Sequence, residues 1–301
     1  MMRALVYDPA VTGGLGLASV AEPEPGPGQV LVDVEAIAVN FGEVVFQHGR
    51  EPGTVVGWDA AGTVATGKLA GRRVVTFGWG GGWAERRAVG VEDLALVPDA
   101  VDLGAASTLP VAGVTALRAL RRLGPVVGRR ILVTGASGGV GRFAVQLAAR
   151  AGAHVVAAVG SAARGAGLAD LGAAEVVVGL ESIHAPVFGV LENVGGAHLA
   201  QAFELLADGG VVQSIGMASR QPTTIDFEQA RIAGGRKRIE SFTIGDERFG
   251  ADLAYLVELL AAGKLDPQIG WRGPWERAPE AVDALLGRRV LGKAVLDLHS
   301  P

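Results

Sequence analysis

The sequence contains no cysteine among its 301 residues, and this absence removes several kinds of chemistry. Disulfides, thiolate nucleophiles, iron–sulfur clusters and cysteine-ligated zinc all need the missing thiol. An excess of charge of one sign is absent as well, because 27 Lys and Arg residues stand against 31 Asp and Glu residues. Without a block of basic residues to neutralise phosphates, we expect no nucleic-acid partner.

Long apolar runs are also missing. No uninterrupted run approaches the roughly 18 residues of a membrane span, and the N-terminal segment lacks the apolar stretch of a secretory signal. We therefore expect a cytoplasmic protein with no membrane partner. Glycine, with 46 residues, and an apolar fraction of 49% are what the sequence has in quantity. They predict a large core, many tight turns, and one large or two moderate domains.

The first hundred residues predict short strands separated by clusters of glycine and proline. We expect these strands over residues 3–7, 30–39, 60–65, 73–77 and 85–89. Val32 and Val34 alternate with Asp33 and Glu35, which indicates that one face of this strand meets water. This part of the chain is expected to form a small barrel or sandwich.

Strands and helices alternate from about residue 107 onward. The run 131–134 is apolar without alternation, as in a parallel strand buried on both faces. Further strands are expected over 154–159, 175–178, 187–192, 211–215 and 239–244, with helices over 140–151, 163–171 and 196–207. Six strands with helical crossovers predict a doubly wound α/β sheet. The tail predicts helices over 251–262 and 279–286 and a strand over 293–298, and is expected to return to the first domain.

A glycine-rich turn lies between the first buried strand and its helix, with the sequence Gly135-Ala136-Ser137-Gly138-Gly139-Val140-Gly141. Glycines here let a pyrophosphate approach the backbone, and the helix N-terminus attracts the anion. The turn therefore predicts a dinucleotide site, although alanine replaces the first glycine of GxGxxG. The same residues also fit G-x-S-x-G, the nucleophile elbow of α/β-hydrolases. A β-rich region before the turn and the lack of an HGGG segment favour the dinucleotide site. A turn that binds nothing is the third alternative.

The end of the next strand bears on which dinucleotide would bind. An NAD site usually has Asp or Glu there for the ribose hydroxyls. This chain instead reads Gly160-Ser161-Ala162-Ala163-Arg164. A guanidinium suits a 2′-phosphate, so the sequence predicts NADPH in preference to NADH. Arg164 as an ordinary solvated helix residue is the alternative.

Several segments, spread over almost the whole chain, carry a family resemblance: 25–32, 38–41, 56–62, 111–116, 135–141, 193–196 and 292–296. Through them the chain resembles the zinc-free medium-chain dehydrogenase/reductases, in the quinone oxidoreductase (zeta-crystallin-like) branch. The resemblance implies a GroES-like β-rich catalytic domain, formed by 1–111 and 247–301. It also implies a Rossmann domain over 112–246, an active site in the cleft between the domains, and a homodimer.

The segment Gly57-Trp58-Asp59 bears on metal binding. Zinc-dependent relatives have Gly-His-Glu there, and a cysteine near the position of Asn40. With the histidine replaced and cysteine absent, we expect no metal site.

The resemblance also implies site residues. Asn40 and Thr115 would be the catalytic polar groups near nicotinamide and substrate, although Asn40 could instead support a loop and Thr115 cap a turn. The cofactor would contact Ser137, Gly138, Gly139, Val140, Gly160, Ser161, Arg164, Ile215, Gly216, Met217, Phe242, Thr243 and Ile244. Many quinone reductases have a tyrosine shortly after the Asn40 position. Here residues 42–47 offer only Glu43 as an ionisable group.

These observations together predict an NADPH-dependent oxidoreductase that transfers hydride to a quinone or another conjugated carbonyl without metal. One alternative is an enoyl-thioester reductase, because Val39-Asn40-Phe41 followed by an acidic residue also resembles polyketide-synthase enoyl reductases. Another, from a different class, is a catalytically idle NADPH-binding structural protein.

Overall fold

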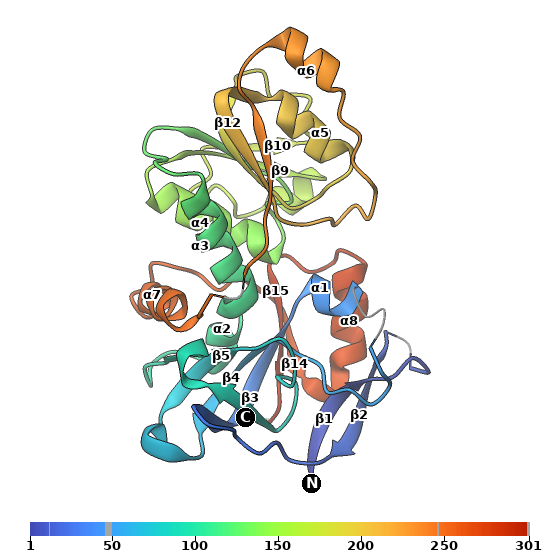
Figure 1. The fold of residues 1–301 in the computed structure, drawn as a ribbon, viewed down its shortest axis with the longest axis vertical. Helices are drawn as coiled ribbons and strands as arrows, with labels where there is room; N and C mark the ends of the chain where they lie inside the picture. The colour runs from blue at the N-terminus through green and yellow to red at the C-terminus, as the bar shows by residue number, and fades with distance from the viewer. Residues whose placement is uncertain (12, 46–49, 246, 300–301) are drawn as a thin grey trace. The chain divides into compact units, whose positions relative to one another are not determined.

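The computed structural model describes residues 1–301 except 12, 46–49, 246 and 300–301. Residues 46 and 47, which belong to the stretch 42–47 where many quinone reductases have a tyrosine, therefore lie outside the described residues. The chain divides into two compact units, one made of Met1–Val114 and Asp246–Pro301, the other of Thr115–Gly245. Figure 1 traces both, with the first unit in blue, cyan and red and the second in green to orange.

The first unit is built on a seven-stranded sheet in the order β14-β15-β3-β4-β5-β7, with β6 also paired to β3. Its strands are β3 (Gln29–Val39), β4 (Asp59–Val64), β5 (Arg73–Phe77), β6 (Arg86–Gly90), β7 (Leu94–Leu96), β14 (Ile269–Pro274) and β15 (Lys293–Asp297). A second sheet pairs β1 (Met2–Tyr7) with β2 (Leu15–Val20). Because β15 runs antiparallel to β3, the tail belongs to the first sheet, as expected from the sequence.

Side-chain alternation in β3 follows the predicted pattern. Val32 and Val34 are fully buried, whereas Glu35 is exposed and Asp33 half-buried. The helices of this unit are α1 (Phe41–Val45), α2 (Leu103–Ser107), α7 (Gly250–Ala261) and α8 (Ala278–Leu286). Helix α3 (Val114–Arg122) begins at the last residue of the segment Met1–Val114, and its other residues belong to the second unit. A π-helical turn, Leu109–Gly113, precedes α3. The sequence missed α1, α2, α3, β2, β7 and β14, most of which are short.

The second unit contains a six-stranded, fully parallel sheet in the order β10-β9-β8-β11-β12-β13. The strands are β8 (Arg130–Val133), β9 (His154–Val159), β10 (Glu175–Val178), β11 (Val187–Glu192), β12 (Leu206–Ser214) and β13 (Arg238–Ser241). This order confirms the doubly wound sheet. Sequence order reverses between β8 and β11, and ligands bind at the carboxyl ends of strands beside such a switch point.

The crossovers of this sheet differ in part from the prediction. The helices are α4 (Gly139–Arg150), α5 (Ala197–Glu204) and α6 (Phe227–Ala233), of which the sequence did not predict α6. The helix predicted over 163–171 was wrong, because only a 3₁₀ turn, Ala162–Gly165, is found there. Gly167 has φ +75°, which lies outside the helical region and ends any continuation. The helix predicted over 196–207 ends early because β12 begins at Leu206.

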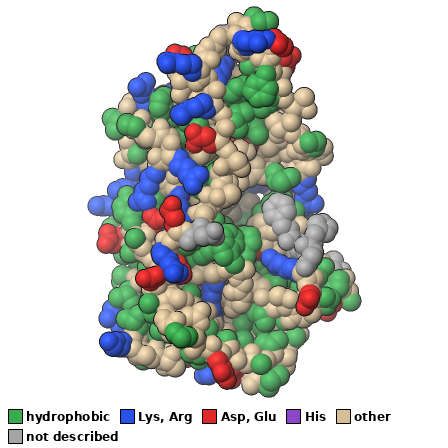
Figure 2. Space-filling view, in the orientation of Figure 1, with side chains coloured by type: hydrophobic (Ala, Val, Ile, Leu, Met, Phe, Trp, Pro, Cys, Tyr) green, Lys and Arg blue, Asp and Glu red, His purple; other side chains and the backbone are tan. Residues whose placement is uncertain are grey.

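The distribution of charged side chains and the length of the helices are the features on which nucleic-acid or membrane binding would depend. On the face in Figure 2, basic and acidic side chains are interspersed with apolar ones and do not form one continuous field of either sign. Among the described helices, none combines the length and apolar character needed to cross a bilayer.

Candidate cofactor site and active site

The predicted dinucleotide turn lies between β8 and α4. Gly138 is the N-cap of α4, and as a glycine it has no side chain to cap the first N–H groups. A Cβ on Gly141 would lie 2.4 Å from the carbonyl oxygen of Gly135 and 2.7 Å from the Cα of Ala136. The helix therefore packs directly on the turn. An anion at this helix N-terminus would accept hydrogen bonds from the N–H groups of the first turn.

Two predicted cofactor residues meet beside this turn. The Nε of Arg164 donates a hydrogen bond to the Oγ of Ser137 at 2.9 Å. Gly160, at the end of the neighbouring strand β9, is exposed, and a Cβ there would meet no atom within 4 Å. The structure thus places a hydroxyl, a guanidinium and open space at the carboxyl ends of adjacent strands. A serine nucleophile needs a base that accepts its proton, so donation from a guanidinium argues against the hydrolase alternative.

A buried glutamate that the sequence analysis did not single out joins three segments at this edge of the sheet, through its carboxylate and its backbone oxygen. Glu192 is fully buried at the end of β11. Its carboxylate accepts hydrogen bonds from Thr134 Oγ1 at 3.0 Å, Val194 N at 2.9 Å and Gly195 N at 2.9 Å. Its backbone oxygen accepts from the N–H groups of the residues that follow β12. Burial raises the pKa of Glu192, while the N–H donors lower it. An acidic residue ending an apolar strand was the signal in the sequence.

The other predicted cofactor residues follow β12 and β13. Met217 is 46% exposed, and Gly216 packs closely enough that a Cβ would lie 2.8 Å from the oxygen of Asn193. Phe242 is buried beneath the guanidinium of Arg122, which lies 4.8 Å from the ring centroid. These segments share the carboxyl edge of the sheet with the turn, but their contact with a cofactor stays a prediction. The residues in question are Ile215, Gly216, Met217, Phe242, Thr243 and Ile244.

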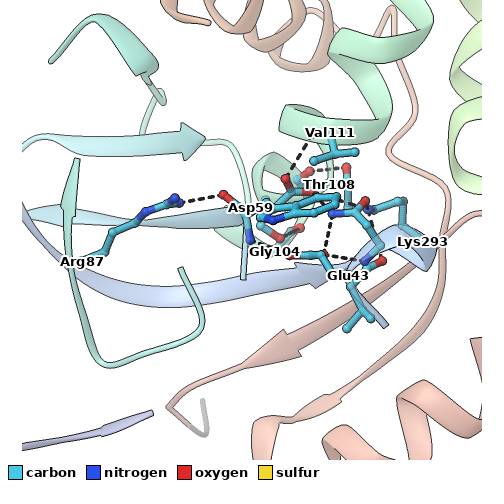
Figure 3. A network of polar contacts seen from close by, with 12 residues as sticks. Glu43, Asp59, Arg87, Gly104, Thr108, Val111 and Lys293 are labelled. Atoms are coloured by element: carbon cyan, nitrogen blue, oxygen red, sulfur yellow. Dashed lines mark hydrogen bonds and ion pairs between the residues drawn. The ribbon is translucent and has the colours of Figure 1, made fainter. Parts of the chain in front are cut away.

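A buried polar cluster lies in the first unit, around the other predicted catalytic residue. Asn40 follows β3, Glu43 lies in α1, Asp59 begins β4 and Lys293 begins β15. Because β3 pairs with both β4 and β15, the sheet brings these positions together from distant parts of the sequence. All four side chains are at most 7% exposed. Figure 3 shows the cluster from close by.

Asn40 connects the members of this cluster. Its Nδ2 donates to Glu43 Oε2 at 2.9 Å and to Asp59 Oδ2 at 2.9 Å, and its Oδ1 accepts from the ammonium of Lys293. Both amide hydrogens are therefore taken by carboxylates. Asn40 could offer a substrate only the remaining lone pair of Oδ1. The predicted catalytic contact of Asn40 stays a prediction, and its observed contacts are those of a positioning residue.

The cluster also holds the segment that replaces Gly-His-Glu. Glu43 Oε1 accepts the N–H of Trp58, and Asp59 Oδ1 accepts the N–H of Val111 at 3.1 Å. Lys293 Nζ lies 3.6 Å from Asp59 Oδ2. Glu43 was considered in the sequence only as the one ionisable group of its loop. The structure instead makes it a buried anchor for the backbone at Trp58.

Burial shifts the ionisation of the whole cluster. Burial, together with the charge of Asp59, raises the pKa of Glu43 to about 8. Burial also raises the pKa of Asp59 and lowers that of Lys293, while the attraction between these two opposes both shifts. Burial lowers the pKa of nearby Arg87 to about 10, so its guanidinium remains charged at neutral pH. Two carboxyl groups and two basic groups are thus buried together away from water.

Thr115, the second predicted catalytic residue, lies near the start of α3 and is 5% exposed. It belongs to the second unit, whereas Asn40 belongs to the first. Its proposed contact with the substrate stays a prediction. Within the described residues, no group of three or more His, Asp or Glu side chains is arranged to hold a metal ion.

Comparisons with known proteins agree with this architecture. A family model described as zinc-binding dehydrogenase matches residues 168–296. The chain is 31% identical over 336 residues to the chloroplastic quinone-oxidoreductase QR1 of Triphysaria versicolor, covering 99% of this chain and 98% of that protein. It is 33% identical over 338 residues to the probable acrylyl-CoA reductase AcuI of Escherichia coli, covering 99% and 100%.

Larger proteins and solved structures also match. The chain is 34% identical to a part of erythronolide synthase EryA2 of Saccharopolyspora erythraea, and spans 9% of the length of that protein. The structure of mycobacterial Rv1454c complexed with NADPH superposes with a TM-score of 0.87 and 28% identity, covering 99% of this chain and 100% of that one. The chain therefore belongs to the medium-chain dehydrogenase/reductases, a family of oxidoreductases, as a quinone-oxidoreductase-like member.

Proposed function

We propose that this protein is an NADPH-dependent reductase that transfers a hydride to a quinone or another conjugated carbonyl without metal. The observation that carries the choice of cofactor is the hydrogen bond from Arg164 to Ser137, beside open space at Gly160. A phosphorylated ribose in that space would meet a guanidinium, and the described segment 160–164 carries no carboxylate. The NADPH complex of the similar mycobacterial structure supports the same assignment.

The chemistry divides between the cofactor and the chain. When bound, NADPH supplies the hydride, and a quinone that accepts it takes one proton from water to become the hydroquinone. The N-terminus of α4 and Ser137 would hold the pyrophosphate, and Arg164 the ribose phosphate. In the first unit, Asn40 and Lys293 place a dipole and a charge in a dry setting, where they act more strongly than in water.

An enoyl- or acyl-thioester reductase is the second candidate. The 33% identity to a probable acrylyl-CoA reductase over the full length of both chains favours it. The two candidates differ in how the product obtains its proton. A hydroquinone anion collects one from water, whereas protonation at carbon benefits from a positioned acid, which contributes about 10²–10⁴ in rate. Both oxygens of Glu43, the ionisable group nearest Asn40 in sequence, accept hydrogen bonds and are buried.

NADPH oxidation with 9,10-phenanthrenequinone and with a simple alkyl enone tests the proposed function. We expect clearly higher turnover with the quinone, and unchanged turnover after dialysis against a chelator. Strong enone reduction with negligible quinone activity would favour the second candidate and would require an acid elsewhere in the chain. Cofactor binding with no turnover of either acceptor would identify the catalytically idle binding protein instead.

Replacing Arg164 with alanine should weaken NADPH binding about tenfold or more and leave NADH nearly unaffected. A hydrogen bond to a charged group contributes roughly 1.5–3 kcal/mol, and about 1.4 kcal/mol corresponds to a factor of ten. Fluorescence titration with each cofactor measures this. Arg150→Ala, at the exposed end of α4 in the same unit, is the matched control and should change neither affinity. Equal losses for NADPH and NADH would place Arg164 away from the phosphate.

A further inference from the structure

An aromatic group in the first unit has no part in the chemistry described so far. The ring of Trp79 lies 5.3 Å from that of Trp58 and 5.1 Å from that of Phe77, nearly perpendicular to both. Phe77 in turn stacks on Phe249 at 3.7 Å. Both phenylalanines are buried, Trp58 is half-buried, and Trp79 is 54% exposed. We call Trp58 and Trp79 the aromatic shelf.

The backbone around the shelf is fixed by Arg87 and by a backbone hydrogen bond between two glycines. The guanidinium of Arg87 donates to the carbonyl of Trp58 at 2.8 Å and to that of Gly80 at 3.3 Å. The N–H of Gly82 donates to the carbonyl of Gly57 at 2.9 Å, so the loop that carries Trp79 is tied to the strand entry at Trp58.

Glycine is required in this loop for that attachment. A Cβ on Gly78 would lie 2.4 Å from the Nη2 of Arg87, and one on Gly82 would lie 2.9 Å from the oxygen of Gly57. The exposed indole of Trp79 is thus presented by an anchored loop and supported by the core pair Phe77 and Phe249. The loop therefore presents the indole of Trp79 as a rigidly supported apolar face that a ligand could contact.

The backbone of Trp58 connects the shelf to the buried polar cluster around Asn40. Trp58 donates its N–H to Glu43, and the next residue, Asp59, accepts from Asn40. Because aromatic rings pair favourably with indoles in stacked or edge-to-face arrangements, this surface suits a planar aromatic acceptor better than a linear acyl chain.

Resting on the proposed function, we propose that Trp58 and Trp79 bind the ring system of a polycyclic quinone, and so make the enzyme selective for flat aromatic acceptors over linear enones and acyl thioesters. Trp79 then sets substrate specificity, while the buried cluster beside it keeps the shelf in place. A contact with another protein through this surface is the competing outcome of the test.

Steady-state kinetics of Trp79→Ala with three acceptors tests this inference: 9,10-phenanthrenequinone, 1,4-benzoquinone and a linear alkyl enone. We expect kcat/KM for phenanthrenequinone to fall about tenfold, mainly through KM. The loss should be about two- to threefold for benzoquinone and less than twofold for the enone. Trp79→Phe should recover most of the loss, and NADPH affinity should not change. Leu96→Ala, an exposed apolar residue of the same unit, is the control and should leave all three unchanged.

If Trp79→Ala loses kcat/KM equally with every acceptor, or loses none with phenanthrenequinone, the inference is wrong. If the variant keeps its selectivity among the acceptors but changes its self-association, the surface serves a protein contact instead. Calorimetric titration of phenanthrenequinone into both proteins separates this result from the proposed function. If the wild-type protein reduces none of the acceptors, the proposed function fails, yet an about tenfold weaker affinity of Trp79→Ala would still support the shelf. Equal affinities of the wild-type protein and Trp79→Ala for phenanthrenequinone would show that the shelf does not bind it.

Discussion

Replacing Lys293 with methionine should lower the stability of the protein by about 3–5 kcal/mol, because it leaves two buried carboxyl groups without their nearest cation. The melting temperature should fall by roughly 10 °C. Calorimetry measures this directly. The loss should be greater at pH 9 than at pH 6, since the pKa of Glu43 is about 8 even beside Lys293. At pH 6 that carboxyl is protonated, so less negative charge is left unbalanced.

Two further variants test whether unbalanced buried charge causes the loss of stability in Lys293→Met. Lys68→Met removes an exposed lysine from the same unit and should change the melting temperature little. Combining Lys293→Met with Asp59→Asn should recover part of the stability, because the second change removes one of the unbalanced charges. A change below about 2 °C for Lys293→Met alone would mean that the carboxyl groups are balanced by other means.

The second large effect is expected from Gly141→Ala. The added Cβ would meet backbone atoms of Gly135 and Ala136 at 2.4–2.8 Å, and neither can move without displacing the turn. We expect a loss of up to about 3 kcal/mol in stability. NADPH affinity should fall roughly a hundredfold, as α4 moves away from β8. Thermal unfolding and fluorescence titration of the same samples give the two quantities.

Gly138→Ala separates packing from cofactor contact. Its Cβ would have only Gly135 O, at 3.4 Å, within 4 Å, so the folded protein should accept it with little change in stability. If the pyrophosphate lies against this turn, the same methyl group should still weaken NADPH binding. Unchanged affinity in both glycine variants would move the cofactor away from the turn.

Local patterns were sufficient for most strands of the second unit and for the helix that follows its glycine-rich turn. The apolar strands β8, β9 and β11, and the glycine turn before α4, lie close to where periodicity placed them. A parallel strand buried on both faces needs a continuous apolar run, so its burial is visible in its own sequence. The helix expected over 163–171 failed because apolar spacing does not reveal that Gly167 adopts a positive φ.

Among the residues of the candidate site, the sequence could predict the positions of some but not the contacts of others. That Ser137, Gly160 and Arg164 lie near one another could be predicted, because each belongs to a segment that follows a strand of one parallel sheet, and parallel strands share their carboxyl edge; their contact with a cofactor stays a prediction. Glu192 ends such a strand too, but its role as an acceptor for three segments depends on contacts across β8, β11 and β12. Only the position of an acidic residue after an apolar run hinted at it.

The sequence by itself determined the doubly wound sheet, the position of the glycine-rich turn before α4 and the exclusion of cysteine chemistry, because each depends on residue type and short-range periodicity. Tertiary structure alone decided the surroundings of Asn40. Lys293 is 253 residues away in sequence and reaches Asn40 only because β15 pairs with β3. Such pairing follows from the packing of the whole unit, so no local pattern could show that the amide of Asn40 is held between two carboxylates and an ammonium.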